Sequence, residues 1–193
     1  MKKSFKVAFT VAFLTSLTGC AYYGSSSAAT EDNYSNSLKI KEDMDKISAA
    51  IRVANINHTG AKTGTSESIR SSLVKDGILI EYPSFGGNSY DLKTSGGKEA
   101  SVVSDVAFVS IGKYVTEGVC KEVNKQSDVG EIVSVDSDLS QIDKYYSVVS
   151  QNHDVKKVSL LPKTVCYANI KEKKHIGYEV VSLVSRVSLA KGA

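Results

Sequence analysis

One face of a helix is visible in the first half of the chain. Apolar residues there follow one another at intervals of four, three, four and three positions, namely Ile40, Met44, Ile47, Ile51 and Ala54. This spacing is typical of an amphipathic α-helix whose charged residues lie on the other side. Because the pattern stops after two heptads, it favours a helix that packs on a sheet over a lone coiled coil.

Three shorter stretches have helical spacing as well. An apolar pair one turn apart, followed by a glycine suited to the C′ position, predicts a short helix over 67–75. Valines four positions apart predict a helix over 114–126, with Cys120 on or beside its buried face. Apolar residues at intervals of three, four and three, after a capping-box pattern, predict a helix over 136–152.

Runs of β-branched residues between these helices predict strands. The predicted strands are 78–83, 101–111, 130–135, 156–161, 164–170 and 176–190. Between the first two runs, a glycine-rich stretch predicts a loop or a ragged hairpin. Together these elements predict a single α+β domain over 38–193, which is long enough to bury its own core.

The residues before this domain have the pattern of an export signal. Three lysines precede an eleven-residue, mostly apolar run over 7–17, and small residues follow it up to Cys20. The run is too short to span a bilayer, so 1–19 is predicted to be a cleaved leader and not a transmembrane helix. The following stretch, 20–37, is small, polar and without periodicity, and predicts a flexible tether with a reach of about 20 to 25 Å.

The sequence Leu17-Thr18-Gly19-Cys20 resembles a bacterial lipobox. The resemblance implies that Cys20 receives a diacylglycerol on its thiol, is cut free behind Gly19 and is then acylated on its new amine. In bacterial lipoproteins, an Asp directly after the lipidated cysteine is a signal for retention in the inner membrane. Ala21 stands at this position, which favours the outer membrane and leaves open which of its two faces carries the protein. The alternative is an ordinary secretory signal followed by a chance cysteine.

Once the leader is removed, the net charge of the chain says little about its binding partners. The full chain has 24 basic and 21 acidic residues, and the leader holds three lysines and no acidic residue, which leaves 21 of each sign. A net charge near zero gives no support for nucleic-acid binding or for a polybasic membrane patch. Attachment to the membrane is therefore expected through the acyl chains on Cys20.

Cysteine and histidine usage favours a disulfide over a metal site. With Cys20 modified, Cys120 and Cys166 are left as a pair in an exported chain, where a disulfide is the usual outcome. The loop-entropy relation gives such a crosslink a stabilising effect of about 4 kcal/mol. The alternatives, a metal pair or a reactive thiol, lack a CxxC motif or a nearby histidine, and the three histidines of the chain are far apart in polar segments. No metal or cofactor is predicted.

Enzyme motifs occur only in fragments. Lys62-Thr63-Gly64, the SxxK at 72–75 and Ser150-Gln151-Asn152 spell the short motifs of serine penicillin-binding proteins. Their order along the chain is wrong for that family, and the chain is too short for its fold. We therefore predict a protein that is not an enzyme.

The order of elements resembles the globular domain of type IVb pilins over about 38–189. The features that match are the amphipathic helix, the stretch "VKDGILIEYP", a helix with "EGVCKEV" and a second cysteine in "TVCYANI" before a terminal strand. The resemblance implies an antiparallel sheet packed on the long helix, with Cys120 and Cys166 closing the C-terminal region. The chain departs from that family because its apolar run precedes Cys20 and is removed, so it cannot form a filament core.

Two functions follow as expectations. The first is a lipid-anchored, non-enzymatic accessory or interaction component of a type IVb or conjugative pilus system. The second is an envelope lipoprotein that binds a periplasmic or external ligand through an unrelated α+β domain. Tyrosines near the cysteine pair, including Tyr145 and Tyr167, are candidates for a contact surface, and the alternative places Tyr146 and Tyr178 at the edge of the core.

Overall fold

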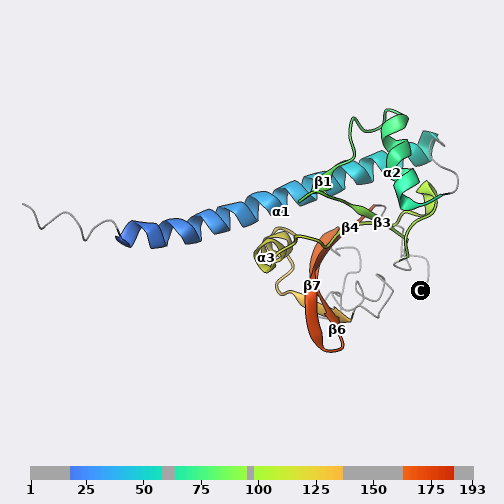
Figure 1. Cartoon of the computed structure of the whole chain (residues 1–193). Coiled ribbons are helices and arrows are strands. Elements are labelled where there is room, and N and C mark those ends of the chain that lie inside the picture. The colour runs from blue at the N-terminus through green and yellow to red at the C-terminus, as the bar shows by residue number, and fades with distance from the viewer. Residues whose placement is uncertain (1–17, 58–63, 95–97, 137–162, 185–193) are drawn as a thin grey trace, which may run out of the picture.

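The computed structural model describes residues 18–57, 64–94, 98–136 and 163–184, and it combines three α-helices with seven short strands over those ranges (Figure 1). The helices are α1 (Thr18–Asn57), α2 (Ser66–Lys75) and α3 (Glu117–Gln126), with a 3₁₀ turn at Val103–Asp105. The strands are β1 (Ser84–Phe85), β2 (Asn88–Ser89), β3 (Asp91–Lys93), β4 (Phe108–Ile111), β5 (Val133–Asp136), β6 (Thr164–Lys171) and β7 (Lys174–Leu183). The α+β class is confirmed.

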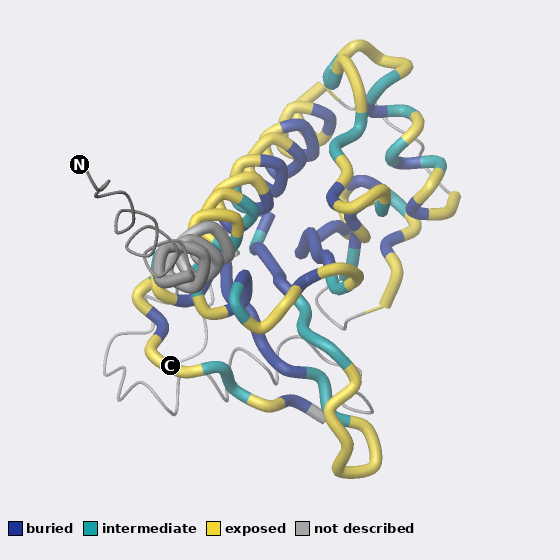
Figure 2. Tube along the Cα trace, turned by 60° about the vertical axis from the view of Figure 1, so that its left-hand side comes forward, coloured by how far each residue is buried: buried dark blue, intermediate teal, exposed yellow. Residues whose placement is uncertain are grey.

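The apolar face of α1 is the centre of the fold, as its spacing predicts. All five of its predicted residues, from Ile40 to Ala54, are completely buried. They share a cluster with residues of α2, α3 and the sheet, and α1 contacts α2, α3 and β4 directly. In Figure 2 the buried side of α1 faces the sheet and its exposed side faces solvent. The domain therefore consists of a helical layer on one face of a sheet.

The main sheet has five strands in the order β3-β4-β7-β6-β5. Its neighbours pair antiparallel except β5 and β6, which are parallel, with Val133 opposite Tyr167. The expectation of a fully antiparallel sheet is therefore wrong at this edge. The sequence predicts both strands but carries no mark of their relative direction, and the chain between them is long enough for the crossover that a parallel pair requires.

The two faces of the sheet carry separate apolar clusters. Because side chains alternate along a strand, Cys166 and Val180 belong to the cluster that includes α1 and α3. Their neighbours Val165 and Val181 point the other way and join a second, smaller cluster. The members of this outer cluster are Phe108, Val129, Val135, Val165, Tyr167 and Val181.

The prediction of an unstructured tether after Cys20 is wrong. Helix α1 begins at Thr18 and continues without a break, and Figure 1 shows its N-terminal part extending well beyond the sheet. Adding one more helical residue costs little once the amphipathic half of α1 has formed, and the alanine, serine and glutamate of this stretch tolerate a helix. Residues 1–17 of the predicted leader lie outside the described residues.

Several other predictions are corrected or confirmed locally. The stretch 78–83 forms no strand, and Ile80 in it is fully exposed. Within 101–111 only β4 is a strand, because the backbone first closes a 3₁₀ turn in which the amide of Asp105 donates to the carbonyl of Val102. The short helices α2 and α3, the ragged β1–β2 hairpin and strands β5, β6 and β7 are confirmed. The helix predicted over 136–152 and the strand over 156–161 fall outside the described residues, apart from Asp136 at the end of β5.

Candidate functional site: the disulfide-braced junction of α3 and the sheet

Helix α3 is positioned by its first turn. The Thr116 hydroxyl accepts a hydrogen bond from the Val119 amide at 3.3 Å, which satisfies one of the free donors at the helix start. The predicted valine spacing then buries Val119 and Val123 against the core. Cys120 lies beside them and is fully buried, so α3 presents its thiol to the sheet.

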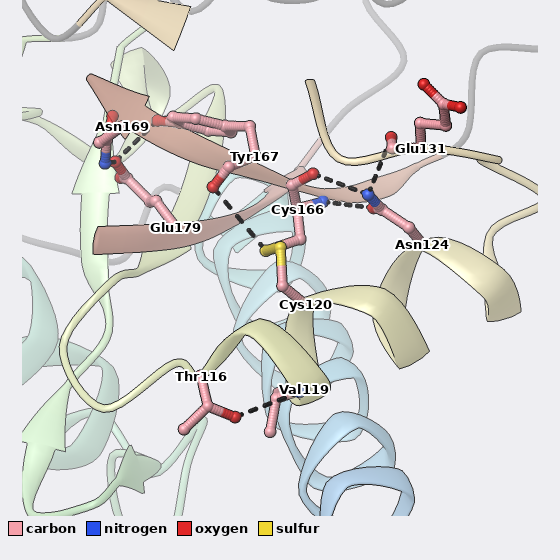
Figure 3. The surroundings of a disulfide bond; sticks show 9 residues. All are labelled: Thr116, Val119, Cys120, Asn124, Glu131, Cys166, Tyr167, Asn169 and Glu179. Atoms are coloured by element: carbon pink, nitrogen blue, oxygen red, sulfur yellow. Dashed lines mark hydrogen bonds between the residues drawn. A yellow bond between two sulfur atoms is a disulfide. The ribbon is translucent and has the colours of Figure 1, made fainter. Parts of the chain in front are cut away.

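The predicted disulfide between Cys120 and Cys166 is confirmed. The two Cα atoms are 5.3 Å apart, within the usual range for this crosslink. Cys166 lies on the inner face of β6, so the bond joins α3 to the strand next to the β5 edge of the sheet (Figure 3). The bridge connects segments 46 positions apart in the sequence.

Asn124, one turn further along α3, completes the junction. Its side-chain oxygen accepts the backbone amide of Cys166 at 2.7 Å, and its side-chain nitrogen donates to the backbone carbonyl of Cys166 at 2.9 Å (Figure 3). Strand β5 starts only opposite Tyr167, so Asn124 supplies at Cys166 the hydrogen bonds that a neighbouring strand would make. Asn124 is not among the residues predicted from the sequence, although a polar side chain directly after Val123 in the 114–126 helix indicates a polar contact beside the buried face.

Helix α3 also approaches α1 closely. A Cβ added at Gly118 would clash with the Asn33 side-chain amide, so a larger residue there would require the Asn33 side chain to move. Further along, the Gln126 side chain donates to the Ser37 hydroxyl at 2.6 Å, and the Lys41 ammonium donates to the Gln126 carbonyl at 3.4 Å. These contacts begin at Asn33, so the last five residues of the predicted tether, 33–37, already belong to the folded unit.

A charged network lies on the outer face of the sheet, at strands β3, β6 and β7. The Glu179 carboxylate accepts hydrogen bonds from the Lys93 ammonium at 2.5 Å, the Tyr167 hydroxyl at 2.7 Å and the Asn169 amide at 3.2 Å. Burial raises the pKa of Glu179, but the Lys93 charge and these three bonds together outweigh burial and hold its pKa below the usual value. The network thus keeps Glu179 ionised.

A second network fastens the loop after α2 onto α1. The fully buried Tyr90 donates its hydroxyl to the Asp43 carboxylate at 3.1 Å, and the Tyr90 carbonyl accepts from the Tyr82 hydroxyl and the Arg70 guanidinium. Burial raises the pKa of both tyrosines, and in Tyr90 the neighbouring Asp43 charge adds to the effect. This arrangement is structural, because every polar group named here has a partner inside the fold.

Of the tyrosines predicted to form a contact surface, Tyr167 does not contribute to one. Tyr167 is only 6% exposed and its hydroxyl bonds to Glu179, so it cannot offer a free ring to a partner. Tyr178 is partly buried and packs against the inner cluster, in agreement with the alternative prediction. Tyr145 and Tyr146 lie outside the described residues.

The enzyme-like motifs and the histidines do not come together within the described residues. In the SxxK segment the Ser72 hydroxyl donates to the Ile69 carbonyl of its own helix. His175 is exposed and its ring packs against that of Tyr178 in a tilted arrangement. His58, His153 and most residues of the other two enzyme-like motifs lie outside the described ranges. Over the described part of the chain, no three His, Cys, Asp or Glu side chains gather into a possible metal site.

None of the helices in the described ranges is long and apolar enough to cross a membrane. Cys20 lies near the start of α1, and its side chain is outside the described residues.

No protein-family model, curated protein or solved structure matches this chain. The lipobox and the pilin-like layout therefore stay hypotheses that rest on the sequence.

Proposed function

We propose that this protein is a lipid-anchored component of the bacterial cell envelope, held at the outer membrane through Cys20. The observation that carries the proposal is the lysine-rich, apolar leader that ends directly before Leu17-Thr18-Gly19-Cys20. Two or more acyl chains would anchor the protein stably without a membrane-spanning segment. Because α1 begins at Thr18, the anchor would be joined to the folded unit through a helix.

We further propose that the anchored domain is a non-enzymatic, pilin-like interaction module. It would act as an accessory of a type IVb or conjugative pilus system. The long helix against a sheet and the Cys120–Cys166 bridge support this proposal. A chain without an apolar N-terminal helix after Cys20 would serve beside the filament and not as one of its shaft subunits.

The parallel pairing of β5 and β6 favours a second candidate. It departs from the antiparallel sheet that the pilin resemblance implies. In this candidate the protein is an envelope lipoprotein that binds a small ligand through an unrelated α+β domain. The described residues include one open surface hollow beside α2, lined in part by Lys75, Arg70 and Tyr82, and the last two already bond to the Tyr90 carbonyl, so a ligand there would have to bind beside these bonds.

The anchor is tested by the fate of Cys20. We expect the wild-type protein to incorporate labelled palmitate, to fractionate with the outer membrane and to show a triacylated N-terminal cysteine by mass spectrometry. The Cys20→Ala variant should lose the label and leave the membrane fraction. An unmodified Cys20 thiol, or a leader still attached to the protein, would contradict the anchor.

The pilus role is tested separately by crosslinking in intact cells at native expression. Recovery of pilin or secretin subunits with the wild-type protein would support it. Recovery with the wild type but not with Cys20→Ala would show that anchoring is required for the contact. Repeated absence of pilus proteins, with the anchor confirmed, would favour the ligand-binding candidate.

A further inference from the structure

The hairpin formed by β6 and β7 reaches beyond the rest of the sheet. Strand β4 ends at Ile111, opposite Val180, and β5 ends opposite Ile170. The hairpin continues several residues past β4 and one residue past β5, and it closes where Lys171 pairs with Lys174. Figure 1 shows it as the part of the sheet that projects farthest from α1. We call the exposed residues 171–176 the hairpin tip.

The hairpin tip is basic, and no side chain of the described residues neutralises its positive charges through an ion pair. It contains Lys171, Lys173 and Lys174 against one carboxylate, Glu172. All four side chains are exposed. None of the three lysines forms an ion pair with a carboxylate of the described residues. In a domain whose mature net charge is near zero, this is a local concentration of positive charge at a projecting point.

The turn at the tip keeps charged side chains in an unfavourable backbone conformation. Glu172 and Lys173 have φ of 49° and 64°, both in the left-handed region. A two-residue hairpin turn with both angles positive strongly prefers Asn-Gly or Asp-Gly. Strained residues of this kind tend to occur where function requires particular side chains.

An apolar side chain accompanies the lysines. The β6–β7 register shifts between Asn169 and Ile170, so that Ile170 lies opposite His175 and Asn169 opposite Gly177. Ile176 falls in this irregularity, pairs with no residue of β6 and is 58% exposed. Long cationic side chains around an exposed aliphatic residue suit a membrane surface, because lysines keep their ammonium groups at the phosphates while their stems and the aliphatic side chain lie deeper.

We propose that the hairpin tip docks on an anionic phospholipid surface, with the three lysines on lipid phosphates and Ile176 in the headgroup layer. This inference rests on the proposed lipid anchor. Each lysine near an anionic surface is expected to raise affinity about fivefold, so three give about a hundredfold. A hundredfold increase gives only weak membrane binding to a free protein. It is effective for a protein already tethered to the same bilayer, because the local concentration of the hairpin tip at the surface is then high. A hairpin tip is also small compared with the 800 Å² or so per partner of a stable protein interface.

The test uses the absence of tryptophan from the chain. Ile176→Trp creates a single fluorescent reporter at the tip of the full-length, lipidated protein. In vesicles of equimolar phosphatidylcholine and phosphatidylglycerol, we expect its emission to shift to the blue and to become protected from an aqueous quencher. Neither change is expected in phosphatidylcholine alone, and high salt should reverse both because screening weakens charge attraction.

The lysines are tested in the same reporter background. The triple variant Lys171→Gln, Lys173→Gln and Lys174→Gln should lose the blue shift. The matched control changes three exposed lysines elsewhere, Lys46, Lys98 and Lys125, to Gln, and should keep the shift at the same net charge.

The outcomes separate the tip from the anchor. Flotation of the protein with vesicles of phosphatidylcholine alone reports the anchor, because the tip is not expected to bind them. Flotation without a blue shift in anionic vesicles would overturn the docking proposal and leave the anchor intact. An equal shift in both lysine triples, or quencher protection by an acidic peptide but not by anionic vesicles, would overturn it as well. Loss of flotation would instead refute the anchor.

Discussion

The two faces of the sheet are stabilised by different chemistry. On the inner face α3 is fixed by a covalent bond at Cys120 and by the neutral amide of Asn124, which bonds to the β6 backbone. On the outer face the polar centre is the Lys93–Glu179 ion pair, with Tyr167 as a further donor. The inner contacts contain no group that titrates near neutral or mildly acidic pH, whereas the outer network depends on an ionised carboxylate. Acid should therefore weaken the outer face before the inner one.

Removing the crosslink should have the largest effect on stability. We expect Cys120→Ala combined with Cys166→Ala to lower the free energy of unfolding by about 4 kcal/mol, because the open chain regains the entropy of a long loop. Urea titration measures the loss. The control is Cys20→Ala, which leaves the bridge in place. If the double variant unfolded at the same urea concentration as this control, the bridge would not be what stabilises the inner face.

Loss of the Asn124 side chain should rank second. Asn124→Ala leaves the buried amide and carbonyl of Cys166 without partners, and we expect a loss of about 2 to 3 kcal/mol. Gln126→Ala on the same helix is the matched control. Gln126 is only partly buried and makes a single side-chain bond to Ser37, so its loss should be about 1 kcal/mol or less. If urea titration gave the two variants equal losses of unfolding free energy, Asn124 would not replace a strand at this point.

On the outer face, Glu179→Gln should alter the response to acid. The pKa of Glu179 is lower in the folded than in the unfolded chain, so its contribution is fully present above its unfolded value of about 4.5 and disappears as the pH falls through the folded value. We expect the variant to be less stable by about 1 to 2 kcal/mol at neutral pH, and the difference to shrink in acid.

Thermal unfolding between pH 7 and pH 3 measures this difference. Glu131→Gln is the control, because only the backbone carbonyl of Glu131 takes part in a hydrogen bond and its side chain is exposed. A constant gap between wild type and Glu179→Gln across this range would place the acid sensitivity elsewhere.

The inner face could be predicted from the sequence much better than the outer one. The spacing of Ile40 to Ala54 and the valines around Cys120 repeat with the helix, and a cysteine pair in an exported chain has one obvious partner. The Lys93–Glu179 pair joins residues 86 positions apart on strands that are not neighbours. Such a contact depends on strand order and direction, which no local pattern contains.

Local patterns also failed where tertiary contacts override composition. The polar stretch after Cys20 has the composition of a tether, yet it is helical because it continues α1, and its Asn33 and Ser37 pack on α3. The apolar run that includes Ile80 has the composition of a strand, yet no strand of the described residues pairs with it. In both cases the neighbours in space decide the structure.

The smallest effect is expected at the hairpin tip, and it has the opposite sign. Replacing Glu172→Asn and Lys173→Gly should stabilise the protein by about 1 kcal/mol, because these residues adopt the left-handed conformation with less strain. Amide hydrogen exchange along β6 and β7 would localise the gain. The control pair Glu172→Gln and Lys173→Gln removes the same charges but keeps the strain, so it should give no gain. If the control pair stabilised the hairpin equally, charge repulsion and not backbone strain would be what destabilises the natural turn.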